Sequence, residues 1–382
     1  MVKRLKIGVI YNYSEEWIGG TYYIDNLVNA LNSLTDEKKP IIIAITRPEW
    51  FKILKAKTNY PYLKYQVNTG EGNLFKKIIN TLLYRTIGKR IFSRKIENLD
   101  GVFPYNQSEH LDPAKIRAFW IADFQEHFLP QFFSYEEIEM RRTAQYTIAH
   151  SNDVLVLSSK NAAQHFKQLY PSHSVKTYVL RFSVTHQKIG PVTNDLLKKY
   201  AIPDQFLICS NQFWQHKNHL VVLKALKYLK ENHQWEIPVL FTGKIGDYRN
   251  ASYYPNLLKF SEENNITNLV KFLGFVPRNE QLILMNHAIT IIQPSLFEGW
   301  STVVEDGKAM NKMIVASNIE VHLEQLKESN ALFFDPVNDE ELAEKLLALH
   351  KIPQQKLFEA HQQRDSVKKF ATSFIRIFNP NT

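Results

Sequence analysis

Continuous apolar runs of strand length alternate along this chain with stretches in which apolar residues recur every three or four positions. Residues 5–11 and 40–46 are β-branched apolar runs, a pattern typical of strands that a parallel sheet buries on both faces. Between these runs, the apolar residues of 22–31 recur at helical spacing. The pattern predicts a strand, a helix and a second strand, with later strands of the same sheet at 154–157 and 177–180.

The alternation restarts after a polar stretch over 183–204, where we predict a hinge. In the second half the predicted strands are 206–209, 238–241, 270–273, 288–292 and 313–316, and the predicted helices are 220–229, 254–264, 280–286, 340–349 and one that begins near 302. Such alternation indicates an α/β fold of two doubly wound, Rossmann-like domains that face a central cleft, with domains at 1–184 and 185–361. Because ligands in such folds bind beyond the carboxyl ends of the strands, the cleft is where we expect the chemistry.

Composition supports two folded domains and a cytoplasmic chain. The sequence has 382 residues, of which 44% are hydrophobic and 22% are charged. The single cysteine, Cys209, permits no intrachain disulfide and favours a reducing compartment. No apolar run reaches the ~18 residues of a spanning helix. The first residues also lack the cleavage region of a signal peptide, so we expect a chain without a leader.

The positive charge is concentrated in residues 51–100, which carry eleven lysines and arginines against three acids, a net +8 out of +9 for the whole chain. This segment includes the amphipathic stretch 74–91, so we expect it to dock peripherally on an anionic membrane and on a lipid-linked acceptor. A solvated face or contact with an acidic soluble acceptor is the alternative. The bases coincide with no recognisable nucleic-acid module, so nucleic acid is not an expected partner.

Common catalytic and cofactor motifs are absent from the sequence. It has no G-x-G-x-x-G, no P-loop, no G-x-S-x-G, no H-E-x-x-H, no cysteine pair and no Asp-x-Asp pair. His216 and His219 stand three residues apart but have no obvious third ligand. We therefore expect no metal and no cofactor.

Residues 293–309 carry groups suited to a nucleotide diphosphate sugar on one short element, between a predicted strand and a predicted helix. The carboxylate of Glu298 at the strand exit can accept hydrogen bonds from sugar hydroxyls. The backbone amides of Ser301, Thr302 and Val303 at the helix start suit a diphosphate. An acid one to two turns into the helix can accept hydrogen bonds from ribose hydroxyls.

This segment resembles the nucleotide-sugar signature of retaining glycosyltransferases of family 4, which have the GT-B architecture. Aligning Gly299 and Trp300 with the glycine and aromatic residue of that signature places Asp306 eight positions after Glu298, in the ribose role. Asp306 replaces the usual glutamate, and Glu305, one position earlier, is the alternative. For both acids, simple stabilisation by the helix dipole is the structural alternative.

A second match covers 209–219, where the family offers an arginine and a lysine to the donor diphosphate. Lys217 fits the lysine, but Asn211 occupies the position of the arginine. Lys244, after a later strand, is a candidate for the lost charge, with a solvated lysine as the alternative.

Matches in the first half are looser. Gly19 and Gly20 fit the glycine loop of the family, where backbone can approach the donor, although a simple turn is the alternative. Asp123 and His127 stand where relatives place acceptor-side residues, with packing or capping as the alternative. Residues 362–382 look like the final helix that crosses back to the first domain.

The resemblance implies a retaining transferase that moves a hexose-type sugar from a nucleotide diphosphate sugar to a saccharide or lipid-linked saccharide, in assembly of a bacterial-type surface polysaccharide or glycolipid. It implies that Glu298, Lys217 and His127 are catalytic, without a covalent nucleophile. The loss of the arginine at Asn211 leaves a noncatalytic sugar-binding protein open, and a phosphorylase or epimerase on the same scaffold is a further alternative.

Overall fold

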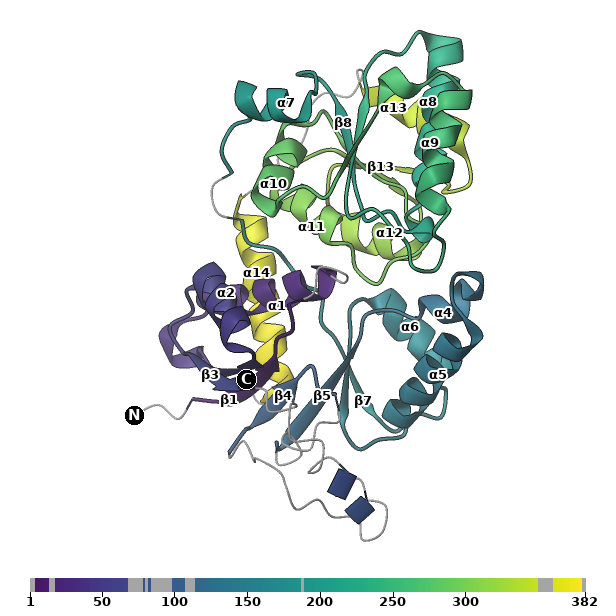
Figure 1. Cartoon of the computed structure of the whole chain (residues 1–382). Coiled ribbons are helices and arrows are strands. Elements are labelled where there is room, and N and C mark those ends of the chain that lie inside the picture. Colours follow the sequence, from purple (N-terminus) through teal and green to yellow (C-terminus); the bar gives the residue numbers. More distant parts are fainter. Residues whose placement is uncertain are drawn as a thin grey trace.

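The computed structural model describes residues 4–13, 18–67, 78–79, 82–83, 98–106, 114–186, 189–349 and 360–379. They form two α/β domains, each built around a parallel sheet (Figure 1). Most of the amphipathic stretch 74–91, with the lysines and arginine at Lys76, Lys77, Lys89 and Arg90, lies outside the described residues. The predicted membrane contact of this segment therefore stays a prediction.

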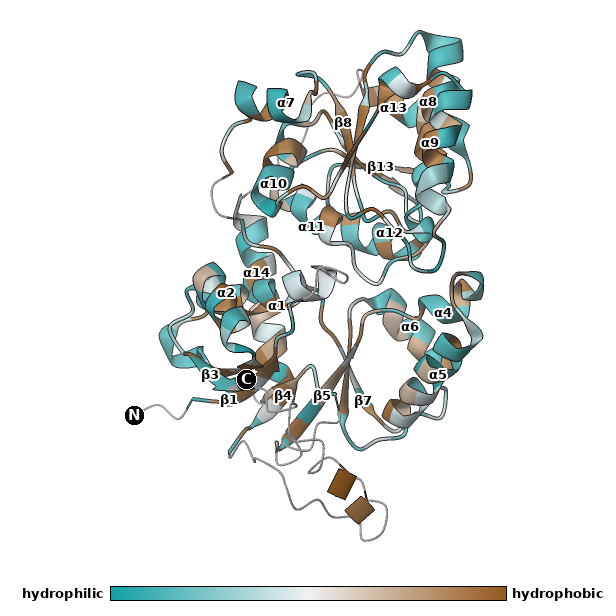
Figure 2. Ribbon diagram, in the orientation of Figure 1, coloured by the Kyte–Doolittle hydropathy of each residue, from teal (hydrophilic) through white to brown (hydrophobic). Residues whose placement is uncertain are grey.

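The first domain has a sheet in the order β3-β2-β1-β4-β5-β6-β7 among the described residues, with every pair parallel. Its strands are β1 Lys6–Ile10, β2 Ile41–Thr46, β3 Leu63–Val67, β4 Gly101–Phe103, β5 Ile116–Ile121, β6 Val154–Leu157 and β7 Lys176–Val179. Its helices are α1 Ile18–Ala30, α2 Pro48–Thr58, α4 Gln125–Phe128, α5 Tyr135–Ala149 and α6 Lys160–Leu169. Hydrophobic residues gather on the strands, while the helices show mixed faces (Figure 2).

The second domain has a sheet in the order β10-β9-β8-β11-β12-β13, again parallel over the described residues. Its strands are β8 Leu207–Ser210, β9 Val239–Thr242, β10 Val270–Gly274, β11 Ile291–Gln293, β12 Ile314–Ser317 and β13 Ala331–Phe334. Its helices are α7 Asn194–Tyr200, α8 His219–His233, α9 Tyr253–Glu263, α10 Arg278–His287, α11 Thr302–Ala309, α12 Glu320–Leu326 and α13 Asp339–Ala348. The strand order reverses at β8, which opens a crevice beyond the carboxyl ends of β8 and β11.

The predicted α/β fold with two doubly wound domains is confirmed. The predicted strands and helices are present, with ends that differ by up to four residues from the predicted ones. The sequence pattern did not identify β3, β4, β5 and β13 or the helices α2, α5 and α6. Of these strands, β3 and β13 lie at sheet edges, Arg117 interrupts the apolar residues of β5, and β4 has only three residues.

The last helix, α14 Ala360–Phe378, packs on the first domain although the chain reaches it from the second (Figure 1). Phe370, Phe374 and Phe378 are buried in the core of the first domain. Gly101 makes room for this helix, because a Cβ there would lie 2.0 Å from Cδ1 of Phe378. The helix ties the two ends of the chain into one domain.

Gly101→Ala should destabilise the protein by about 1–3 kcal/mol, because the added methyl overpacks a filled core. Thermal unfolding measures the effect as a lower Tm. Gly190→Ala is the matched control, since a Cβ at Gly190 meets nothing within 4 Å. Equal Tm values for the two variants would show that the Phe378 ring moves away from the added methyl group without loss of stability.

Candidate functional site

The candidate site is a cavity of about 230 Å³ between the two domains, at the carboxyl ends of β8 and β11. The start of α1 and helix α6 of the first domain lie opposite α11 and α12 of the second (Figure 1). Of the residues singled out from the sequence, the following line the cavity: Gly19, Gly20, Asp123, Asn211, Lys217, Lys244, Glu298, Gly299, Trp300, Ser301, Thr302, Val303 and Asp306.

Glu298 lies in the turn that joins β11 to α11, and its side chain is largely buried. Its Oε1 accepts hydrogen bonds from Lys217 Nζ at 2.6 Å, Ser295 Oγ at 2.7 Å and Gln293 Nε2 at 2.9 Å. Burial opposes ionisation, but the lysine and the hydrogen bonds outweigh it and hold the pKa of Glu298 below its usual value. The carboxylate is therefore ionised at neutral pH, and its Oε2, which none of these donors uses, remains an acceptor for a ligand.

Lys217 and Asn211 play different parts beside this carboxylate. Lys217 ends a 3₁₀ turn, Gln215–Lys217, after β8, and its ammonium is held by Glu298. The amide of Asn211 is buried and pairs with Gln293, donating to its Oε1 at 3.1 Å. Asn211 thus links the ends of β8 and β11 and supplies no charge. Lys244 is exposed at the cavity and makes no ion pair among the described residues.

The start of α11 offers fewer amides than the sequence suggested. Ser301 is the N-cap, and its Oγ accepts a hydrogen bond from Val304 N. Its own N–H donates to Gln325 Oε1 at 3.1 Å, so that amide is already satisfied. The amides of Thr302 and Val303, at the first two helical positions, are the ones that can meet an anion.

Asp306 lies one turn further along α11, fully buried. Its Oδ1 accepts from Arg278 Nη2 at 2.6 Å and lies 3.2 Å from His186 Nε2. Burial acts to raise the pKa of Asp306, but Arg278 and His186 outweigh it and hold the pKa below its usual value. The other oxygen, Oδ2, is buried without a partner among the described residues. A buried acceptor without a donor is costly, so this oxygen is suited to a ligand hydroxyl.

Glu305 faces away from the central cavity. It accepts hydrogen bonds from Lys308 Nζ at 2.8 Å and Gln325 Nε2 at 2.9 Å. It lines a separate groove beside Arg181 and Glu324. Of the two acids considered for the ribose role, Asp306 is the one at the cavity.

The glycines that line the cavity bring the domains together. Gly19 and Gly20 lie in the first turn of α1, since the helix begins at residue 18 and not after the glycines as the sequence predicted. At Gly299 a Cβ would lie 2.3 Å from the carbonyl oxygen of Ala122 in the first domain. Trp300 donates from Nε1 to the carbonyl of Phe182 at 3.1 Å, again across the domains.

Of the two residues predicted for the acceptor side, Asp123 lies at the cavity and His127 does not. Burial raises the pKa of Asp123 to about 6, and Glu126 and Glu298 act in the same direction. Asp123 lines the central cavity, but His127 does not line it. The ring of His127 instead bonds through Nε2 to Gln145 Oε1 at 2.9 Å, on α5. His127 therefore lies outside this cavity with its ring held by α5, and its catalytic and acceptor-side roles stay predictions.

Residues 193–369 match the family model described as Glycosyl transferases group 1. The matched segment covers most of the second domain and extends into α14. The chain is 22% identical over 187 residues to the O-antigen chain mannosyltransferase RfbU of Salmonella typhimurium, a match that covers 48% of this chain. The chain spans about half the length of this curated relative, 50%.

Two solved structures similar to the whole chain are glycosyltransferases by description or bind a nucleotide. A glycosyltransferase from Rickettsia africae superposes with a TM-score of 0.65 at 18% identity, covering 99% of this chain and 100% of that one. Anabaena HepE in complex with UDP and glucose superposes with a TM-score of 0.62 at 14% identity, covering 98% and 95% of the two chains. These likenesses show the GT-B fold.

The second domain contains site residues that the sequence did not single out, above all Arg278 at the start of α10. Arg278 lies with its guanidinium carbon 4.7 Å from the centroid of the Tyr22 ring and bonds to Asp306. The sequence analysis pointed only to the cleft as a whole, and nothing in the sequence pairs Arg278 with Asp306, 28 positions later. The two histidines considered for a metal have different partners: His216 accepts a hydrogen bond from Arg249, and His219 contacts Tyr253.

No group of three or more potential metal ligands occurs within the part of the chain that the structure describes. Over the same residues, no helix has the length and apolar character needed to cross a membrane.

Proposed function

We propose that this protein is a retaining glycosyltransferase of family 4 that moves a hexose-type sugar from a nucleotide diphosphate sugar to an acceptor hydroxyl. The observation that carries the proposal is the ionised Glu298, with one oxygen on Lys217 and the other available, in the turn that opens α11 within the segment that matches the family model. The mannosyltransferase RfbU and the UDP-bound HepE support a nucleotide-sugar donor.

In the proposed reaction, Glu298 holds hydroxyls of the donor sugar and Asp306 Oδ2 accepts from a ribose hydroxyl. The bond between the anomeric carbon and the diphosphate oxygen breaks, and its electron pair stays on that oxygen. Lys217, Lys244 and the amides of Thr302 and Val303 stabilise the negative charge. The departing oxygen takes the proton of the acceptor hydroxyl, which attacks from the same face, so the anomeric configuration is retained.

The acceptor is proposed to be a saccharide or lipid-linked saccharide in the assembly of a bacterial-type surface polysaccharide or glycolipid. The O-antigen role in the description of RfbU supports this class. The +8 segment over 51–100 is the basis for peripheral docking on an anionic, cytoplasmic membrane face. No nucleic-acid partner is proposed.

The rate of transfer should rise as pH increases through about 6, because the ionised carboxylate of Asp123 at the acceptor side accepts a stronger, charge-assisted hydrogen bond from the acceptor hydroxyl. Below its raised pKa the carboxyl group is protonated, its negative charge is lost and this hydrogen bond is weaker. Initial rates across mildly acidic and neutral pH measure the effect. Asp123→Asn should transfer more slowly and should not show this rise in rate through about pH 6. The same rise in Asp123→Asn would assign the titration to another group.

Activity should survive excess EDTA, since Lys217, Lys244 and two helix amides are available to the diphosphate without a metal. Rates before and after chelation measure this directly. A complete loss that Mg²⁺ or Mn²⁺ restores would show that an ion neutralises the leaving group.

A thermal-shift panel of UDP-, GDP-, ADP- and dTDP-sugars tests the donor class, because a ligand that binds the folded state raises the Tm. We expect one nucleotide to give a clear shift with and without its sugar. A shift without turnover under any condition would favour the noncatalytic alternative suggested by Asn211. Turnover that requires free phosphate, or that alters the sugar without cleaving the donor, would favour a phosphorylase or an epimerase.

A further inference from the structure

One side chain of α12 bonds to the backbone at the start of α11. Gln325 is buried, and its Oε1 accepts a hydrogen bond from Ser301 N at 3.1 Å. Its Nε2 donates to the carbonyl oxygen of Ser301 at 2.8 Å and to Glu305 Oε1 at 2.9 Å. The same carbonyl oxygen accepts the first hydrogen bond within α11, from Glu305 N at 3.2 Å. The amide of Gln325 therefore holds both backbone polar groups of Ser301.

The Ser301 carbonyl sets the direction of the next amide. The carbonyl oxygen of Ser301 and the N–H of Thr302 belong to one planar trans peptide unit, in which they point in opposite directions. Ser301 is the N-cap, so the N–H groups of Thr302 and Val303 have no partner within the helix. Both residues line the central cavity. A hydrogen bond that holds the Ser301 carbonyl therefore also fixes the direction of the Thr302 N–H.

The neighbouring residue in α12 ties this helix to the first domain. Glu324 Oε1 accepts from Lys160 N at 2.9 Å, and its Oε2 accepts from Asn161 N at 3.0 Å. These are the first two amides of α6, so a carboxylate of the second domain caps a helix of the first, where the helix dipole favours a negative charge (Figure 1). Glu324 also pairs with Arg181. Helix α12 therefore bonds to the first domain through Glu324 and to the start of α11 through Gln325.

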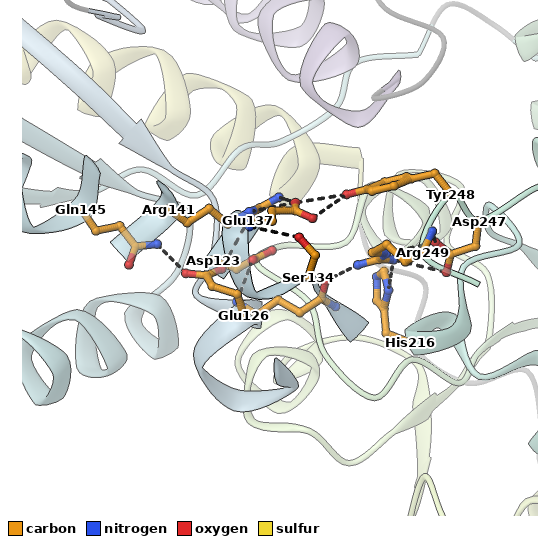
Figure 3. A network of polar contacts seen from close by, with 11 residues as sticks. Asp123, Glu126, Ser134, Glu137, Arg141, Gln145, His216, Asp247, Tyr248 and Arg249 are labelled. Carbon is orange, nitrogen blue, oxygen red and sulfur yellow. Dashed lines mark hydrogen bonds and ion pairs between the residues drawn. The ribbon is translucent and has the colours of Figure 1, made fainter. Parts of the chain in front are cut away.

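A second set of contacts across the domains involves a different segment of the second domain. Tyr248 Oη donates to Glu137 Oε1 at 3.1 Å (Figure 3), and Arg249 Nη1 donates to Gln125 Oε1 at 3.3 Å. These bonds join α4 and α5 of the first domain to the segment after β9, so they hold the domains together independently of α12.

We infer that Gln325 and Glu324 are positioning residues for the donor diphosphate. Gln325 orients the Thr302 N–H, and Glu324 makes this orientation depend on the contact between α12 and α6. The inference rests on the proposed function, in which the amides of Thr302 and Val303 stabilise the negative charge of the diphosphate. Neither Gln325 nor Glu324 lines the central cavity, so both act through α11 and not by touching the donor.

Binding of a nucleoside diphosphate and of its bare nucleoside by variants of the full chain tests the inference. The base is the one that gives the largest shift in the thermal panel. Isothermal titration measures binding of the diphosphate, and saturation-transfer NMR titration measures binding of the nucleoside, which has the ribose and the base but no phosphate.

Two variants remove the proposed contacts. Gln325→Met keeps the length of the side chain without its hydrogen bonds, and Glu324→Gln keeps the shape of the side chain without the charge that caps α6. Two controls match them: Glu320→Gln changes an exposed acid on the same helix, and Tyr248→Phe removes the hydrogen bond to Glu137 that joins the domains elsewhere.

We expect Gln325→Met to weaken binding of the diphosphate by about tenfold or more and to leave binding of the nucleoside unchanged, because only the diphosphate meets the amides. Glu324→Gln should also weaken diphosphate binding selectively, by a smaller factor. It should cause no further loss when combined with Gln325→Met, since Glu324 acts through Gln325. Glu320→Gln and Tyr248→Phe should bind both ligands as wild type does.

Equal losses for the nucleoside and the diphosphate in Gln325→Met would show a purely structural role and overturn the inference, as would unchanged diphosphate binding. Losses that add in full in the double variant, or the same selective loss in Tyr248→Phe, would also overturn it. Thermal unfolding shows whether each variant folds; if Gln325→Met does not, unchanged diphosphate binding in Glu324→Gln overturns the inference. A wild-type protein that binds neither ligand would instead count against the proposed function.

Discussion

Glu298→Gln should lower kcat/KM for the nucleotide sugar by about 100-fold or more while the chain stays folded. The glutamine keeps the shape of the side chain but loses the negative charge that binds the sugar hydroxyls and holds Lys217 at 2.6 Å. Hydrogen bonds to charged groups are worth about 1.5–3 kcal/mol each, and every 1.36 kcal/mol is tenfold in rate. Steady-state kinetics with the donor found in the thermal-shift panel measure the loss.

The loss in Glu298→Gln should be specific to the sugar. Binding of the bare nucleoside diphosphate should be nearly unchanged, because Glu298 is proposed to contact the sugar and not the ribose. Glu320→Gln, at an exposed position of α12, is the control and should keep full activity. Full activity in Glu298→Gln would remove the donor-site assignment.

Asp306→Asn should weaken binding of the nucleoside diphosphate itself by about 10- to 100-fold, since it removes the charged acceptor for a ribose hydroxyl and releases Arg278 from its partner. Isothermal titration with the nucleoside diphosphate measures this. Glu305→Gln is the matched control on the same helix, because Glu305 bonds to Lys308 and Gln325 outside the cavity. A larger loss in Glu305→Gln than in Asp306→Asn would exchange the roles of the two acids.

Arg278→Gln distinguishes a role of Asp306 in binding ribose from a role in pairing with Arg278. If Asp306→Asn acts only by leaving Arg278 buried without a partner, Arg278→Gln combined with Asp306→Asn should restore affinity. If Asp306 binds ribose, the double variant should remain weak. Thermal unfolding of the three variants reports the stability component separately.

The central strands could be predicted from the sequence because a parallel sheet that is covered on both faces needs continuous apolar runs, as in β2 and β8. β3, at the sheet edge, reads Leu-Lys-Tyr-Gln-Val, and such a polar mixture has no strand signal of that kind. The segment from Glu298 to Asp306 could be found because one strand, one turn and one helix carry it, so the spacing in sequence reflects the spacing in space.

Contacts between distant segments could not be predicted in this way. Asn211 reads as a lost arginine in the sequence, and only the structure shows that its amide is paired with Gln293, 82 positions away. The orientation of His127 depends on Gln145 in α5, and the pairing of Arg278 with Asp306 depends on how α10 packs beside α11. Each of these contacts is set by tertiary packing, which local periodicity does not encode.

Proton NMR of nucleotide-sugar turnover by the full chain tests the central claim most directly. The account predicts release of the nucleoside diphosphate together with a glycoside, or a free sugar where water is the acceptor, whose first-formed anomer has the configuration of the donor. Glu298→Gln should abolish the signal over the same time. A product of inverted configuration, or no cleavage of any nucleotide sugar by a chain that binds its nucleotide, would contradict the account.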